Sequence, residues 1–154
     1  MAAKKSTQSD QLAEQAKLVR EALPPNQQSV VFKLATEAGY LTGLADGVED
    51  VAERAALVRA VEALSQGLVL EWEVDDLLSE AAAALKTEGV DARAKSIGKQ
   101  LTELGAADAG ILIAAIVGLA TSGIDKTEAS VLEKIGTAAG LAKPQIGALV
   151  KKAR

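Results

Sequence analysis

The sequence contains no cysteine and no histidine. Disulfide bonds, thiolate or imidazole zinc sites, Ser-His-Asp triads and cysteine nucleophiles are therefore excluded for this chain, because each requires one of these residue types. A metal ion would have to be held by oxygen ligands, which are the ligands that Ca²⁺ and Mg²⁺ prefer. The lack of cysteine also fits a reducing compartment.

Aromatic residues and long apolar runs are scarce as well. Phe32, Tyr40 and Trp72 are the only aromatic residues among 154. The most apolar stretch, residues 109–120, is shorter than the roughly 20 residues that cross a bilayer. The N-terminus, from Met1 to Ser6, leads into polar residues and not into the apolar segment of a signal peptide. We therefore expect a cytoplasmic protein without membrane insertion.

What the chain does contain is abundant alanine and a moderate charge. Apolar residues make up 49%, charged residues 25%, and the formal net charge is −4. Alanine has the highest helix propensity, whereas strands favour β-branched and aromatic residues. The composition therefore predicts an all-α protein, and the length fits one domain with an ordinary core.

Apolar residues recur at helical spacing along the chain. Residues 1–9 are polar and expected to be disordered, and residues 10–154 are expected to form a single helical domain. The N-terminal helix is predicted over 10–23, ended by Pro24 and Pro25. Further helices are predicted at about residues 29–45 (with Val30 on the inner stripe), 51–66 (capped by Gly67), 71–86, 91–104, 107–121, 126–139 and 144–153. The helix at 107–121 is apolar on nearly all sides, which predicts a central buried helix.

A short segment of the chain occurs twice. Gly43–Glu53 returns 75 residues later as Gly118–Glu128, with Gly, Leu, Ala, Asp and Glu coinciding. The apolar stripes of the next two helices also match, at offsets of 75 and 72. We therefore predict a compact bundle of two pseudo-twofold-related helical repeats, at about 29–87 and about 107–153. The helix at 10–23 lies outside these repeats, so it could pack across both or dock on a partner.

The first copy of the repeat carries a cluster of four carboxylates: Asp46, Glu49, Asp50 and Glu53. Carboxylates this close repel one another unless a cation or solvent separates them, and Gly47 lets the backbone turn sharply between them. Three or four converging oxygens would suit a divalent cation such as Ca²⁺ or Mg²⁺. The loop is not an EF-hand, because Leu57 stands where that loop requires a bidentate glutamate.

Helix capping is a competing explanation for part of this cluster. Asp50-x-x-Glu53 has the spacing of a capping box, and the same spacing recurs in the second copy. Acidic residues in a first helical turn also complement the helix dipole. Capping does not account for Asp46 and Glu49, which precede the helix and have no acidic counterparts in the second copy.

A second acidic group surrounds the only tryptophan, Trp72: Glu71, Glu73, Asp75, Asp76 and Glu80. These residues either form the solvated first turns of a helix or make Trp72 a half-exposed anchor for a partner. Basic residues gather at the C-terminus, where they complement the last helix dipole: Lys143, Lys151, Lys152 and Arg154. The charge separation suits self-association or a partner with both signs, and the acidic net charge argues against nucleic acid.

The motif Ala45-Asp46-Gly47-x-x-Asp50-x-x-Glu53 precedes and opens a predicted helix. It resembles the A-D-G-x-[apolar]-x-x-x-E pattern of the TerB-like tellurite-resistance family, in which the ADG loop recurs in the second half. The second copy here keeps the alanine, an apolar residue and Glu128, whereas Thr121-Ser122 replaces Asp-Gly. The resemblance covers about residues 30–152.

This resemblance implies a compact helical protein whose acidic patch binds a divalent metal. Asp46 and Glu53 fall on the family's acidic positions, Asp50 is an addition, and Glu49 replaces the usual apolar residue. Family members act in stress responses that include tellurite resistance, often within assemblies near the membrane. We therefore expect a non-enzymatic module that binds Ca²⁺ or Mg²⁺ weakly and contacts protein partners, with peripheral membrane complexes among them.

Two other functions are compatible with the residues. A metal-independent adaptor or self-assembling structural protein would use the N-terminal helix and the face around Trp72. A hydrolase using metal-activated water would need a substrate pocket beside Asp46. No nucleophile and base can be paired from the sequence, so an enzyme has no residue set to support it.

Overall fold

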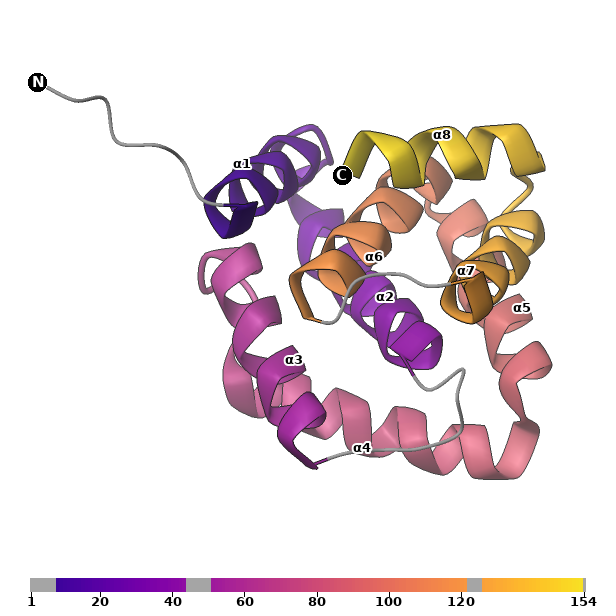
Figure 1. The fold of residues 1–154 in the computed structure, drawn as a ribbon, viewed down its shortest axis with the longest axis horizontal. Helices are drawn as coiled ribbons and strands as arrows, with labels where there is room; N and C mark the ends of the chain where they lie inside the picture. Colours follow the sequence, from indigo (N-terminus) through magenta and orange to yellow (C-terminus); the bar gives the residue numbers. More distant parts are fainter. Residues whose placement is uncertain (1–7, 44–50, 122–125, 154) are drawn as a thin grey trace, which may run out of the picture.

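The computed structural model describes residues 8–43, 51–121 and 126–153, and only the backbone of residues 8–10, 51–53 and 126–127. Within these ranges the chain is all-α and has no strand (Figure 1). The described helices are α1 (Gln8–Glu21), α2 (Pro25–Gly43), α3 (Val51–Ser65), α4 (Glu71–Glu88), α5 (Val90–Glu103), α6 (Ala107–Thr121), α7 (Lys126–Ala138) and α8 (Lys143–Ala153).

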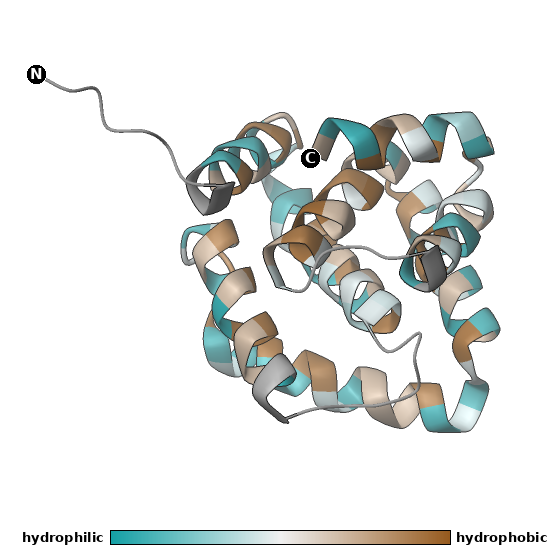
Figure 2. Cartoon of the chain, viewed as in Figure 1, coloured by the Kyte–Doolittle hydropathy of each residue, from teal (hydrophilic) through white to brown (hydrophobic). Residues whose placement is uncertain are grey.

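The helices α2 and α6 cross at the centre of the molecule (Figure 1). Every residue of α6 from Gly110 to Gly118 is buried, which confirms the central helix predicted from its apolar composition. In Figure 2 this helix is mostly brown, whereas the outer helices carry teal on their solvent sides. The crossing is close, because a Cβ added at Gly39 would lie 3.0 Å from Val117 Cγ1.

The remaining helices pack around α2 and α6 in what we call an exchanged packing. The helix that follows one central helix packs against the other central helix. α3 packs against α6, and α7 packs against α2. α1 lies on α3 and α6, whereas α5 lies on α7 and α2. α4 covers α2 and α3, and α8 covers α6 and α7. Helices from each half of the chain therefore pack against the central helix of the other half. The buried residues of both halves form one hydrophobic core.

Most predicted helix boundaries agree with the structure to within two residues, and the clearest difference is the start of α2. The sequence pattern predicts a start at residue 29, but the helix begins at Pro25. Proline suits a first helical position, because its φ is already helical and the N–H that it lacks would have no intrahelical partner there. The buried face also differs from the prediction, since Val31 is fully buried whereas Val30 is 45% exposed.

α3 and α7 end with the same backbone hydrogen-bond pattern, but a different residue type takes the left-handed conformation at each end. Gly140 has a φ of 86° after α7, and the Leu141 N–H donates to the Gly136 carbonyl. After α3, Gln66 takes the left-handed conformation with a φ of 53°, and the Gly67 N–H donates to the Glu62 carbonyl. The predicted capping glycine is therefore the second residue of this turn, not its first.

Candidate functional site

The predicted cation ligands lie where the described structure is interrupted. Asp46, Glu49 and Asp50 are outside the described residues, and Glu53 is the third residue of α3, of which only the backbone is described. Within residues 8–43, 51–121 and 126–153 there is no group of three or more His, Cys, Asp or Glu side chains that could hold a metal ion. The cation site at residues 46–53 stays a prediction.

The two D-x-x-E motifs coincide with helix starts in the chain. α3 begins at Val51 and α7 at Lys126, each one residue after the aspartate of its motif. Glu128 lies in the first turn of α7, where a carboxylate complements the helix dipole. Both aspartates are outside the described residues, so the capping bonds themselves remain predictions.

Of the five large apolar side chains that are exposed among the described residues, three lie at or just before the start of α4. Trp72 is 63% exposed, Leu70 is 43% exposed and Leu68 is 37% exposed. Leu70 precedes the helix and makes no side-chain cap, and the Glu71 N–H instead donates to Glu62 Oε2 at 2.8 Å. The α3–α4 connection thus presents apolar side chains to solvent beside a helix start.

A groove of about 900 Å³ lies between α3 and α4, and Trp72 forms part of its wall. Its apolar wall is formed by Ala55, Val58, Leu70 and Trp72, and its polar lining by Arg54, Arg59, Glu62, Glu71 and Asp75. Arg54 spans the two helices, because its Nη2 donates to Asp75 Oδ1 at 3.0 Å and to Ser79 Oγ at 2.8 Å. We call the exposed apolar residues Leu68, Leu70 and Trp72, together with this groove, the α3–α4 face.

Among the described residues, the corresponding surface of α7 and α8 exposes no large apolar side chain. At an offset of 75, Glu133 takes the position of Val58, and at an offset of 72, Pro144 takes the position of Trp72. Lys143 Nζ lies 3.3 Å from Glu133 Oε1, and the lysine side chain is 78% exposed. The packing of such a pair of helices therefore does not require the apolar character of the α3–α4 face.

A second groove, of about 760 Å³, lies between α1, α8 and the α5–α6 connection. Its walls are mainly apolar, and Leu18 stands 60% exposed at this groove. Gln15 links α1 to α8, because its Nε2 donates to the Lys152 carbonyl at 2.7 Å, while its Oε1 is buried without a hydrogen-bond partner.

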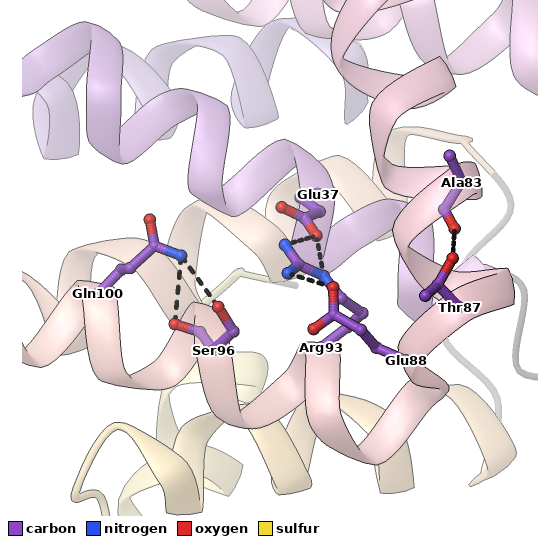
Figure 3. Close-up of polar contacts among 7 residues, drawn as sticks. All are labelled: Glu37, Ala83, Thr87, Glu88, Arg93, Ser96 and Gln100. Atoms are coloured by element: carbon purple, nitrogen blue, oxygen red, sulfur yellow. Dashed lines mark hydrogen bonds and ion pairs between the residues drawn. The ribbon is translucent and has the colours of Figure 1, made fainter.

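The sequence patterns missed a buried ion pair between α2 and α5 (Figure 3). Arg93 Nη2 lies 2.7 Å from Glu37 Oε2, and the two side chains are 16% and 8% exposed. Burial lowers the pKa of Arg93, but the hydrogen bond and charge of Glu37, with a further contribution from Glu88, raise the pKa above its ordinary value. In the sequence, the signal for this ion pair is Glu37, a charged residue within the otherwise apolar stripe of α2. The ion pair joins α5 to the central helix α2.

No protein-family model matches the chain, and no curated protein or solved structure matches it either. Over the described ranges, none of the helices is both long and apolar enough to cross a membrane. The resemblance to a family therefore rests on the sequence motif around Asp46 and on its second copy.

Proposed function

We propose that the protein is a non-enzymatic TerB-like helical module that contacts protein partners in a stress response. The observation that carries this proposal is the exposed α3–α4 face, above all Trp72 at 63% exposure. Tryptophan is among the residues that most often dominate protein interfaces, because it combines a large apolar area with few rotatable bonds. A groove beside such a residue provides the concave surface that a partner side chain can fill.

The comparison with α7 and α8 supports a functional origin for this surface. Both pairs of helices bury apolar residues at matching positions, such as Leu57 with Leu132 and Val74 with Ile146. Their exposed positions differ, because Trp72 matches Pro144 and Val58 matches Glu133. Packing accounts for the shared buried residues but leaves the exposed tryptophan unexplained, whereas binding a partner explains it.

The exchanged packing supports the proposed pseudo-twofold arrangement of repeats. The contact of α3 with α6 has a counterpart in the contact of α7 with α2. In both cases, the helix that follows one central helix packs on the other central helix. α1 packs on α3 and α6 as α5 packs on α7 and α2. We therefore extend each proposed repeat by one helix, so that α1 and α5 occupy equivalent places.

Weak binding of a divalent cation by Asp46, Glu49, Asp50 and Glu53 is the second part of the proposal. Its support is the motif itself and its place in the chain, between the end of α2 at Gly43 and the first turn of α3. Calorimetric titration with Ca²⁺, Mg²⁺ and Mn²⁺ should show saturable binding that Asp46→Ala abolishes. Glu103→Ala, which removes an exposed carboxylate at the end of α5, is the control and should bind as the native protein does. Absence of saturable binding to the native protein would remove the cation from the proposal.

Photo-crosslinking in the cells that produce the protein tests the interaction surface. A photoreactive phenylalanine analogue at position 72 should give discrete adducts, whereas the same analogue at the exposed position 99 of α5, outside this surface, should give fewer. Equal adducts at both positions, or none at position 72, would contradict the proposal. The mass of the adduct identifies the partner class, because an adduct of twice the chain mass contains two copies.

The alternative function is a metal-independent adaptor or self-assembling structural protein. The opposite charges of α4 and α8 favour self-assembly in particular, since they provide two complementary surfaces on one chain. Unchanged crosslinking in the presence of a chelator would favour this alternative over the cation-dependent module.

A further inference from the structure

We infer that the partner of the α3–α4 face is α8 of a second copy of this chain. This inference rests on the interaction surface proposed above and names its occupant. The two elements are complementary in charge and in size of side chain, and they lie on opposite edges of the molecule (Figure 1).

The first ten residues of α4 carry negative charge alone. Residues 71–80 contain five acidic residues and no lysine or arginine. Two of these carboxylates have basic partners within the molecule, since Glu73 lies 3.8 Å from Lys33 and Asp75 lies 3.0 Å from Arg54. Glu71 and Glu80 are exposed on either side of this segment, and Trp72 stands beside the first of them.

α8 carries the opposite charge and small side chains. It contains Lys143, Lys151 and Lys152 and no acidic residue. All three lysines are exposed, and Lys143 also lies 3.3 Å from Glu133 within the molecule. Pro144 and Ala148 are exposed one helical turn apart between them, so the surface offers a shallow apolar strip with an ammonium group at each end. Such a strip can accept a flat indole ring, and lysine stems and ammonium groups pack well against tryptophan.

The charges of the two helices are inverted at matching positions. At the offset of 72, Glu71 corresponds to Lys143 and Glu80 corresponds to Lys152. The two carboxylates are therefore separated along α4 by the same distance as the two ammonium groups along α8. Residues nine apart lie about 180° from each other around a helix, so a contact between α4 of one copy and α8 of another brings one of these charge pairs together while the remaining charges add to the overall attraction.

The location of the two surfaces determines the kind of assembly. α4 and α8 lie on opposite edges of the molecule, with the central helices between them (Figure 1). One copy therefore uses its α4 toward one neighbour and its α8 toward another. A contact between two different surfaces that does not close on itself yields an open chain of copies. Opposite charges make this association weaken as salt rises.

Sedimentation velocity over a range of concentrations tests the inference. In low salt, the average mass of the native protein should rise beyond that of a dimer, and about 0.5 M NaCl should return it toward the monomer. Trp72→Ala combined with Glu80→Lys, or Lys151→Glu combined with Lys152→Glu, should each weaken association about tenfold or more. Glu103→Lys, and Lys95→Glu combined with Lys99→Glu, on the exposed side of α5 are controls that match the charge changes of the two double variants, and they should associate like the native protein.

Mixing the two double variants gives the sharpest outcome. One retains only a working α8 surface and the other only a working α4 surface, so the mixture should form a one-to-one dimer that does not grow with concentration. A native protein that is monomeric at every concentration would overturn the inference, as would a closed native dimer or a mixture that fails to associate. The proposed function and this inference can be tested separately. Crosslinking at position 72 to a different protein would support the proposed function even if the native chain is monomeric.

Discussion

The pair α3–α4 and the pair α7–α8 are built on one pattern but differ on the outside. Both bury leucine in the first helix, at Leu57 and Leu132, and a β-branched residue in the second, at Val74 and Ile146. Only the first pair exposes a large aromatic side chain, Trp72. Positions that pack into the core are constrained by volume and shape, whereas exposed positions are free to differ. The difference between the pairs therefore locates the proposed functional surface on α3–α4.

The two pairs also differ in how a preceding helix holds them. α1 is joined to the end of α3 by polar contacts, since the Arg20 guanidinium donates to the Ser65 carbonyl and to Gln66 Oε1. α5 is joined to α7 by close backbone packing at Gly98, where a Cβ would lie 2.6 Å from Ala138 Cβ. α5 is thus more closely packed on α7 than α1 is on α3.

The largest effect is expected from breaking the ion pair that fixes α5. Arg93→Ala should lower the free energy of unfolding by about 3–5 kcal/mol, because it leaves the Glu37 carboxylate buried without its partner. Position 112 matches position 37 at the offset of 75 and holds a buried leucine. Glu37→Leu combined with Arg93→Ala should therefore be less destabilising than Arg93→Ala alone. Urea denaturation measures both, and an equal or larger loss in the double variant would contradict this explanation.

Packing of α5 on α7 gives the next largest effect. Gly98→Ala should cost about 1–3 kcal/mol, because the added methyl group would meet the backbone of Ala138 and Ala139 as well as a side chain. Gly147 is the matched control, since it is helical and a Cβ added there would have no neighbouring atom within 4 Å. Gly147→Ala should stabilise the protein by about 0.5–1 kcal/mol through helix propensity. Thermal unfolding of the two variants should shift in opposite directions.

Exchanging the residues that close α3 and α7 tests the difference at the helix ends. Gly140→Gln should cost about 1–2 kcal/mol, because a side chain at a φ of 86° is strained. Gln66→Gly should change stability by less than about 1 kcal/mol, because relief of the same strain offsets the lost hydrogen bond from Arg20. Chemical denaturation of both variants checks this, and a large loss in Gln66→Gly would mean that Arg20 depends on this contact more than we expect.

The smallest effect on stability is expected at the residue that matters most for the proposed binding. Trp72→Ala should change the free energy of unfolding by less than about 0.5 kcal/mol, because most of this side chain is already in water. Leu78→Ala in the same helix removes a fully buried side chain and should cost about 2–5 kcal/mol. A large loss of stability for Trp72→Ala would show that the ring serves the core and not a partner.

Much of the fold could be predicted because helical periodicity is a local property. The stripes of α5, α6 and α7 and the helix start at Val51 follow from residues close together in the chain. The predicted start of α2 is late because a pair of prolines is typical of a break, although Pro25 in fact opens the helix. The acidic cluster at Asp46 is identified from the sequence and lies outside the described residues, so it stays a prediction.

The sequence by itself determined the helical composition, the buried central helix and the exclusion of cysteine and histidine chemistry, because these depend on residue types and local spacing. Only the tertiary structure decided that Trp72 faces solvent, that Arg93 meets Glu37 and that each central helix packs against α3 or α7 from the other end of the chain. These features depend on which surfaces meet across long sequence separations, and helical periodicity within one segment does not specify its partner.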